Sequence, residues 1–416
     1  MPLVAGVDSS TQSTKVLVVD AETGETVASG RASHVVMGSD GARESDPESW
    51  WKALQAALAA TGRVGEIKAI SIAGQQHGMV VSDEDGPLLP APLWNDTRSA
   101  PDARELIDRF GGAGWWAEEI GVVPVASFTV SKWAWLRRTQ PEVAARVSSI
   151  RLPHDWLTQK LTGRGVTDRG DASGTGWWST LSSAYHPVVL EGTGLQPAQL
   201  PEVLGAAQPA GEVERAAASV TGLASGIPVG PGTGDNMGAA LGLGLSPGAP
   251  VISLGTSGTA YSVSNQRVSD PEGTVAGFAD ATNRFLPLTA TLNCTLAVDR
   301  MAEWLGLDRE GAAEHTEVVV LPYLDGERTP NLPRAAGSIL GLRHSTTSSE
   351  ILLAAYQGAM ASLLDALDRI DAISSGIAAD APLVLIGGGA RGSVWQRVAA
   401  TMSGRSLIIP ESEELV

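Results

Sequence analysis

The stretch LVAGVDSSTQSTKVLVVD, residues 3–20, decides the fold. Two apolar runs flank a turn of small hydroxyl-bearing residues, a pattern that is typical of a β-hairpin. A further apolar run at residues 25–31 extends the hairpin to a meander. Asp46 and Pro47 then predict a helix over residues 47–61, because Asp is a favoured N-cap and Pro suits the first helical position.

The same pattern returns later in the chain, where PVISLGTSGTAYSV covers residues 250–263. A second hairpin with a turn of small residues indicates two related halves, and we expect domains at residues 1–244 and 245–416. Strands interspersed with helices predict the α/β class. Further strands are expected at residues 67–73, 318–322, 383–386 and 406–409, and further helices at residues 100–110, 131–138, 154–161, 235–243, 295–305, 348–373 and 391–403.

The composition excludes several classes of protein. A net charge of −17 over 416 residues repels phosphate backbones, which argues against a nucleic-acid partner. Cys294 is the single cysteine, so no intrachain disulfide can form and a reducing, cytoplasmic location is favoured. The N-terminus lacks the basic region of a signal peptide. The longest uncharged stretch, residues 236–266, is too rich in Gly, Ser, Thr and Pro for a membrane helix.

The first turn, DSSTQSTK at residues 8–15, has the composition of a phosphate-binding loop. Small hydroxyl residues let backbone N–H groups approach a phosphate, Lys15 adds positive charge, and Asp8 could hold Mg²⁺. The alternative is a surface hairpin with a capping Asp. The second turn, GTSG at residues 255–258, favours the phosphate interpretation. No Lys is followed by Ser or Thr, so a Walker-type loop is absent.

The segment GGGARG at residues 387–392 follows an apolar run and allows two interpretations. Its glycines satisfy GxGxxG, and Glu411 lies beyond the next apolar run, as in a dinucleotide-binding fingerprint. This supports an NAD-linked oxidoreductase, but it leaves both hydroxyl-rich hairpins unexplained. The same glycines can instead let a nucleotide lie against the backbone at the start of a helix.

Three polar segments could bind and activate a hydroxylated substrate. GDNMG at residues 234–238 offers Asp235 as a general base, unless this Asp only caps a helix, and Asn236 as a hydroxyl contact. GQQHG at residues 74–78 places Gln76 and His77 after an apolar strand, although a lone His is often structural. WNDTR at residues 94–98 adds the ring of Trp94, with an internal Asp96–Arg98 ion pair as the alternative for its charges. The six His show no metal-ligand spacing.

Taken in order, DSSTQSTK, GQQHG, LWNDTRS, GDNMG, SLGTSGT and GGGARGSVWQ resemble the FGGY carbohydrate kinases over essentially the whole chain. The resemblance implies a duplicated actin-like, ribonuclease H-like fold, with mixed sheets flanked by helices and the active site in the interdomain cleft. It implies ATP, Mg²⁺ and transfer of the γ-phosphoryl group to a sugar hydroxyl. The QHG triplet points to D-xylulose, phosphorylated at O5; ribulose, gluconate or another polyol is the alternative.

The resemblance also implies roles for individual residues. Asp8 is expected to be the metal-associated acid and Asp235 the proton acceptor. The sugar contacts are expected to include Gln76, His77, Asp235 and Asn236, and the nucleotide contacts Ser13, Thr14, Lys15, Gly255, Thr256, Gly388, Gly389 and Ser393. In the family pattern a helix follows residues 411–414, whereas this chain stops at Val416, so we expect the second domain to lack its terminal helix. The oligomeric state is left open, with a homodimer among the options.

Overall fold

The computed structural model describes residues 2–330, 332, 334–374 and 376–411. The chain forms two compact units. Of the described residues, unit 1 comprises 2–242 and Phe278–Arg284, and unit 2 comprises Leu243–Gly277 and those within 285–411. The prediction that the second domain lacks its terminal helix concerns the end of the chain, and residues 412–416 lie outside the described residues.

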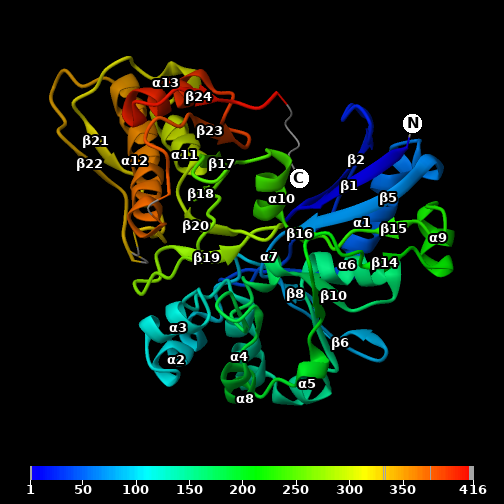
Figure 1. Ribbon diagram of the computed structural model, residues 1–416. Helices are drawn as coiled ribbons and strands as arrows, with labels where there is room; N and C mark the ends of the chain where they lie inside the picture. The colour runs from blue at the N-terminus through cyan, green and yellow to red at the C-terminus, as the bar shows by residue number, and fades with distance from the viewer. Residues whose placement is uncertain (1, 331, 333, 375, 412–416) are drawn as a thin grey trace. The chain divides into compact units, whose positions relative to one another are not determined.

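The central sheet of unit 1 begins with the expected meander (Figure 1). Strands β1 (Leu3–Ser9), β2 (Ser13–Asp20) and β3 (Thr26–Ser33) pair antiparallel in sequence order. Strand β5 (Ile67–Gly74) lies parallel to β1 on its other side. Side chains of β1 alternate between buried and half-buried, as the period-2 pattern of the sequence predicts. The sheet continues in the order β14-β15-β5-β1-β2-β3, with β16 also paired to β5.

Two helices of unit 1 cover this sheet. Helix α1 (Pro47–Ala60) packs on β2 and β3, and α6 (Pro153–Thr162) packs on β5. The predicted cap of α1 is confirmed, because the Asp46 Oδ1 accepts a hydrogen bond from the Glu48 backbone N–H at 3.0 Å. The buried face of α1 carries Trp50 and Leu54, which join the strand side chains in one core.

The remaining elements of unit 1 are short. Strands β14 (Gly211–Glu212), β15 (Pro228–Val229) and β16 (Thr233–Gly234) complete the sheet. Four small sheets accompany it. Three are pairs: β4 (Glu44–Ser45) with β8 (Ala91–Pro92), β10 (Val166–Asp168) with β13 (Glu202–Leu204), and β11 (Trp178–Ser179) with β12 (Ala184–Tyr185). The fourth has three strands, β6 (Val80–Asp83), β7 (Gly86–Pro87) and β9 (Ser149–Arg151). The helices are α2 (Ala100–Arg109), α3 (Ala113–Glu119), α4 (Thr129–Thr139), α5 (Pro141–Arg146), α7 (Arg169–Ala172), α8 (Pro187–Thr193), α9 (Arg215–Thr221) and α10 (Asp235–Gly242).

Unit 2 repeats the strand order of unit 1. Its sheet has the order β19-β20-β18-β17-β23-β24. Strand β17 pairs antiparallel with β18, β18 pairs antiparallel with β20, and β23 lies parallel to β17, as β5 does to β1. The strands are β17 (Pro250–Leu254), β18 (Gly258–Ser262), β19 (Ala276–Ala279), β20 (Phe285–Thr291), β23 (Leu383–Ile386) and β24 (Leu407–Ile408).

Three helices build the core of unit 2 together with this sheet. Helix α12 (Ser348–Ser374) packs on β18 and β20, and it also contacts α11 (Thr295–Leu305) and α13 (Ser393–Ser403). The prediction of an α/β fold with mixed sheets flanked by helices is therefore confirmed. Strand β20 was not predicted, because Pro287 interrupts its apolar run. The hydrogen-bonded ladder with β18 accommodates this proline, since the paired residues begin at Leu288.

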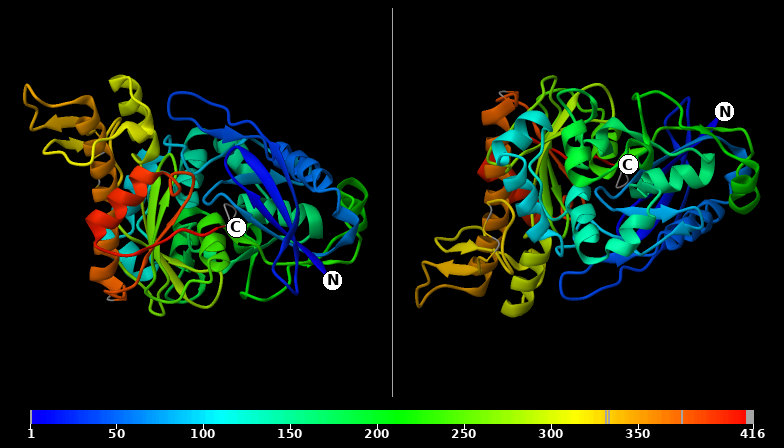
Figure 2. Two further views of the ribbon diagram at one scale, coloured as in Figure 1. Left: turned by 90° about the horizontal axis from the view of Figure 1, so that it is seen from above. Right: turned by 90° about the horizontal axis from the view of Figure 1, so that it is seen from below.

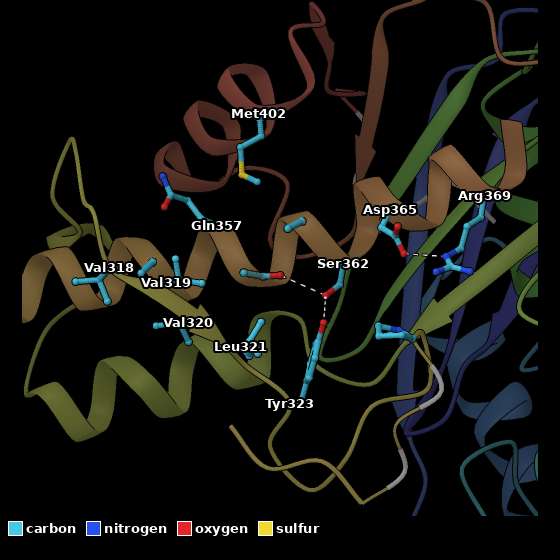
Figure 3. A pocket seen from close by; sticks show the side chains of 14 residues that line it. Val318, Val319, Val320, Leu321, Tyr323, Gln357, Ser362, Asp365, Arg369 and Met402 are labelled. Carbon is cyan, nitrogen blue, oxygen red and sulfur yellow. Dashed lines mark hydrogen bonds and ion pairs between the residues drawn. The ribbon is translucent and has the colours of Figure 1, made fainter. Parts of the chain in front are cut away.

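A small sheet lies beside α12. Strands β21 (Val319–Leu321) and β22 (Ser338–Leu340) pair antiparallel, and Figure 2 shows them, in yellow and orange, extending outward from the orange helix. A pocket of about 440 Å³ lies between β21 and α12, lined by Val320, Gln357 and Ser362 among others (Figure 3). None of the predicted site residues lines it. Within the described ranges, no helix has both the length and the apolarity to cross a bilayer.

Candidate functional site

Three parallel strands of unit 1 end together and bring two predicted motifs to one edge of the sheet. Strands β1 and β16 both pair with β5, and the register aligns Asp8 and Thr233 with the same residue, Ala73. Adjacent strands lie about 4.8 Å apart, so the segments that leave these strands are neighbours. The segments carry Gln76 after β5 and Asp235 after β16.

Asp235 and its neighbours form a hydrogen-bonded group. Asp235 is the first residue of α10, and its Oδ1 accepts hydrogen bonds from the backbone N–H and the Nδ2 of Asn236, at 2.7 and 2.8 Å. The Nδ2 of Asn236 also donates to Gln76 Oε1 at 3.0 Å. Both of these hydrogen bonds from Asn236 fall on Oδ1 of Asp235. Residues that are 160 positions apart in the sequence thus share one polar cluster.

The electrostatic setting of Asp235 suits proton transfer near neutral pH. Burial and the neighbouring Asp8 carboxylate raise the pKa of Asp235 to about 7. Both effects disfavour the charged form, the first through loss of hydration and the second through like-charge repulsion. A base is most effective when its pKa lies close to the working pH. The carboxylate can therefore accept a proton from a hydroxyl group.

His77 is buried and fixed by contacts on several sides. Its backbone has φ 65°, in the left-handed region that residues other than glycine rarely adopt. Its Nδ1 lies 3.0 Å from the carbonyl oxygen of Gly174, which can only accept, so Nδ1 carries the hydrogen. In the neutral ring Nε2 is then an acceptor. The ring also packs against Phe128 and Phe278, with centroids 4.9 and 5.7 Å away.

The WNDTR segment divides into two parts. Trp94 Nε1 donates to Thr11 Oγ1 at 3.0 Å, so its indole is tied to the first hairpin turn. The alternative for the charged residues is confirmed, because Arg98 Nη2 lies 2.6 Å from Asp96 Oδ2. Arg98 also pairs with Glu44 and lies 4.4 Å above the ring of Trp135. Its guanidinium is thus engaged within unit 1, and the ring of Trp94 stays a predicted contact for the sugar.

The first hairpin turn consists of three residues, 10–12, between β1 and β2. Two of the predicted nucleotide contacts lie in β2 and are buried. Ser13 and Thr14 begin β2 and are buried, and the hydroxyl of Thr14 lies 3.3 Å from that of Ser9. Lys15 stands opposite Asp8 in the antiparallel register and is half-buried. Backbone groups of the turn, more than the hydroxyls of Ser13 and Thr14, are therefore placed to meet a phosphate.

The residues of unit 1 fit an Mg²⁺ ion that arrives with a nucleotide. In the part of the chain that the structure describes, no cluster of three or more His, Cys, Asp or Glu side chains could hold a metal by itself. Mg²⁺ is commonly bound by one or two carboxylates together with substrate phosphates. Asp8 supplies such a carboxylate at the end of β1, where its Oδ2 accepts a hydrogen bond from Ser10 Oγ.

In unit 2 the glycine loop and the second hairpin turn are joined through Leu254. The backbone N–H of Gly389 donates to the Leu254 carbonyl at 2.9 Å. A Cβ on Gly387 would lie 2.9 Å from the same oxygen, and Gly387 has φ 84°. A Cβ on Gly388 would meet nothing within 4 Å, so the backbone of this residue faces open space. The loop is suited to a flat ligand that approaches the main chain.

The second turn is anchored to the start of α11. The carbonyl oxygen of Gly255 accepts hydrogen bonds from the N–H and the hydroxyl of Thr295, at 3.0 and 2.9 Å. The carbonyl oxygen of Thr256 accepts from the N–H of Leu296 at 3.4 Å. Ser393 begins α13, and its hydroxyl donates to Glu310. The structure thus brings Gly255, Thr256, Gly388 and Gly389 together and leaves the Ser393 hydroxyl engaged with an acid.

A buried charged cluster supports the strand before Asp235, and no sequence motif indicated it. His154 is fully buried, with Nδ1 2.9 Å from Asp171 Oδ2 and Nε2 3.2 Å from Asp155 Oδ1. Burial opposes a charge here, but the neighbouring carboxylates raise the pKa of His154 to about 9. Asp168 Oδ2, beside this cluster, accepts from the Thr233 hydroxyl at 2.8 Å and so holds β16 in place.

Comparison with known proteins identifies the family. The chain matches the N-terminal domain of the FGGY family of carbohydrate kinases over residues 3–242 and the C-terminal domain of that family over residues 251–416. It is 58% identical over 419 residues to a xylulose kinase of Streptomyces coelicolor, and 55% identical over 417 residues to a xylulose kinase of Streptomyces rubiginosus. Each match covers 100% of this chain and 86% of the relative.

A solved structure is similar over the same extent. The crystal structure of xylulose kinase from Bifidobacterium adolescentis superposes with a TM-score of 0.88 at 36% identity, covering 100% of this chain and 90% of that one. The chain therefore belongs to the FGGY family of carbohydrate kinases. This confirms the expected family and fold. It also disfavours the NAD-linked alternative, in agreement with a sheet in which β18 pairs antiparallel with both β17 and β20.

Proposed function

We propose that this protein is a xylulose kinase that transfers the γ-phosphoryl group of ATP to O5 of D-xylulose. The observation that carries the proposal is the group of Asp235, Asn236 and Gln76, in which a carboxylate with a pKa raised to about 7 accepts a hydrogen bond from the amide of Asn236, and that amide also donates to Gln76. Identity of 58% to a xylulose kinase, over 100% of this chain and 86% of that relative, supports the choice of sugar.

In the proposed reaction, the protein binds the sugar mainly through unit 1. Gln76, His77 and Asn236 contact its hydroxyl groups, and the ring of Trp94 lies against it. Asp235 Oδ2 takes the proton of the attacking hydroxyl as the new O–P bond forms and the bond from the γ-phosphorus to the bridging oxygen breaks. The amide donors on Oδ1 hold the carboxylate in one orientation while the proton moves.

The nucleotide is proposed to contact two groups of residues. In unit 1 these are Ser13, Thr14 and Lys15, whose hairpin offers backbone N–H groups and one positive charge. In unit 2 the phosphate contacts are Gly255 and Thr256, and the adenosine contacts are Gly388, Gly389 and Ser393. Asp8 would hold Mg²⁺, which when bound neutralises charge on the phosphates. Because the Ser393 hydroxyl donates to Glu310, it can donate to the nucleotide only after release from this acid, whereas its oxygen can still accept.

We also propose a cytoplasmic location. The support is the single cysteine, Cys294, which is buried and whose thiol pKa is raised by burial to about 12. Such a thiol is poorly reactive and forms no intrachain disulfide. The proposed partner is a small-molecule sugar, and a homodimer stays a prediction.

The proposal is tested by measuring ADP release with D-xylulose, D-ribulose, gluconate and glycerol at equal concentrations. We expect kcat/KM to be largest for D-xylulose. A mass spectrum of the product should show one added phosphoryl group, and periodate cleavage should locate it at O5. A larger kcat/KM for another sugar would refute the choice of substrate, while sugar-independent ADP release alone would refute the kinase assignment.

A further inference from the structure

Lys132 is a buried lysine whose ammonium group is hydrogen-bonded to backbone carbonyls. It lies in α4 with 1% of its surface exposed. Its Nζ donates to the backbone carbonyl of His77 at 2.9 Å and to that of Ser127. Among the described residues, none of its hydrogen bonds is to a carboxylate. Burial lowers the pKa of Lys132 to about 7, with Asp96 opposing the shift. Burying an ammonium group costs free energy, which its hydrogen bonds to the two carbonyls offset in part.

The carbonyl that Lys132 holds belongs to a strained residue. His77 has φ 65°, and this conformation persists only when its surroundings impose it. Two donors from the first turn of α4 reach its carbonyl oxygen, Lys132 Nζ at 2.9 Å and the Thr129 hydroxyl at 3.4 Å. The first is a charge-assisted hydrogen bond, which is the stronger type. The carbonyl is therefore fixed mainly by the ammonium group.

The imidazole of His77 has its own, separate support. Its Nδ1 is bound to the Gly174 carbonyl, and Phe128 lies beside its ring. A Cβ on Gly174 would lie 2.6 Å from His77 Cε1, so this position leaves no room for a larger residue. Backbone and ring are thus held by different elements, α4 on one side and the segment after α7 on the other. The position of the ring depends on both.

We propose that Lys132 is a positioning residue for sugar recognition: its ammonium group holds the His77 backbone in the left-handed conformation that presents the imidazole to the substrate. The inference rests on the proposed role of His77 as a sugar contact. Lys132 does not touch the sugar; it acts through the main chain of the residue that does. This role accounts for the burial of Lys132, whose hydrogen bonds go to the backbone carbonyls of His77 and Ser127.

The direct test is Lys132→Met, which keeps the length of the side chain and removes the donor. We expect the KM for D-xylulose to rise roughly 10- to 100-fold, which is the loss of one charged hydrogen bond, with the KM for ATP within about two-fold of wild type. The preference for D-xylulose over its C3 epimer D-ribulose should fall as well. Lys160→Met is the matched control, because Lys160 pairs with Glu48 in the same unit and should leave both KM values unchanged.

Two further variants separate positioning from general stability. Gly174→Ala displaces the His77 ring without touching Lys132, so it should raise the D-xylulose KM and spare that of ATP. Lys132→Gln keeps a shorter, neutral donor and covers the case in which Lys132→Met does not fold; we expect an intermediate KM. Circular dichroism melting curves accompany each variant, so that a loss of stability is not mistaken for a change in affinity.

Two outcomes would overturn the inference. One is an unchanged sugar KM in whichever Lys132 variant is soluble, and the other is an equal rise in the KM for sugar and for ATP. Failure of the proposed function is recognised separately, in wild type, by a preference for another sugar. In that case the Lys132 variants are compared with wild type using the preferred sugar, and an unchanged KM for that sugar would refute the role of Lys132.

Discussion

The two sheets have the same order of strands, but the loop after β5 carries polar side chains and the loop after β23 begins with glycines. Strand β5 in unit 1 is followed by two glutamines and a histidine, and β23 in unit 2 is followed by three glycines. The hairpin turns differ in the same sense. Asp8 stands close before the first turn, whereas Leu254 stands directly before the second.

The difference shows how one topology supplies two kinds of chemistry. Side chains at fixed positions, such as Gln76 and His77, can distinguish the hydroxyl groups of a sugar by donor and acceptor. A loop without side chains, such as Gly387–Gly389, exposes its backbone and suits a ligand common to many enzymes. The two acids with proposed roles, Asp8 for Mg²⁺ and Asp235 for proton transfer, both belong to unit 1. We therefore expect substitutions in the two loops to affect different substrates.

The largest effect is expected for Asp235→Asn, which removes the proton acceptor and keeps the shape of the side chain. We expect kcat to fall by about 10²–10⁴-fold, the usual contribution of a positioned base. Binding of D-xylulose should be largely kept, because Asn236 and Gln76 remain. Initial-rate kinetics together with calorimetric titration of the sugar measure both. Turnover near the wild-type value would show that another group accepts the proton.

The next effect is expected for His77→Ala in the unit 1 loop. Removing a buried hydrogen-bonding side chain from a sugar site should raise the KM for D-xylulose by roughly 10-fold or more. The KM for ATP should stay within about two-fold, since the proposed adenosine contacts belong to unit 2. Steady-state kinetics with each substrate varied in turn give both constants. Equal changes in the two constants would mean that His77 has a structural role only.

The pH profile should reflect the ionisation of Asp235. Its pKa is raised to about 7, and only the deprotonated form accepts a proton, so activity should be lost as the pH falls through 7. Below that value, kcat/KM for D-xylulose should fall about ten-fold per pH unit. Measurements between pH 5 and 9 with a stable coupling system would show this. A profile that is flat from pH 5.5 to 8 would contradict the assignment, and the profile of Asp235→Asn should lose this limb.

The smallest effects compare two neighbouring glycines of unit 2. Gly387→Ala should reduce the free energy of unfolding by about 1–2 kcal/mol, because φ 84° is unfavourable for alanine and the new Cβ would meet the Leu254 backbone. Gly388→Ala should leave stability unchanged, since its Cβ would meet no atom within 4 Å. Urea unfolding measures both.

The KM for ATP of these two variants distinguishes an effect of backbone strain from the loss of a contact with the nucleotide. Gly388→Ala should raise the KM for ATP while the KM for D-xylulose stays constant, if the nucleotide lies on this backbone. An unchanged ATP KM in Gly388→Ala would remove the loop from the nucleotide site. Such a result would also remove the contrast between the two units.

The parts of the fold that were predicted depend on local signals. The meander β1–β3 follows from alternation and from a turn of small residues, and α1 follows from Asp46 and Pro47. Strand β20 escaped prediction because Pro287 normally marks an edge or an end of a strand, and the short strands of unit 1 are too brief to show a period. Helix α12 was predicted almost to its ends, since its length gives the helical period many repeats.

The site divides in the same way. The motifs located Asp235, Asn236 and Gln76, and the structure places the last two within a hydrogen bond of one another. The supporting residues were not located, because their contacts join distant segments. Lys132 reaches a residue 55 positions away, and Asp168 reaches one 65 positions away. Neither stands in a recognisable motif, and buried charge cannot be read from composition.

The central claim is that the sugar is recognised by the loop after β5 and the nucleotide by the loop after β23. Hydrogen exchange measured with each ligand alone tests it most directly. D-xylulose should slow exchange at the amides of residues 75–78 and 235–236, and a non-hydrolysable ATP analogue at those of residues 255–257 and 387–389. Protection of residues 387–389 by D-xylulose, with residues 75–78 unchanged, would contradict the account.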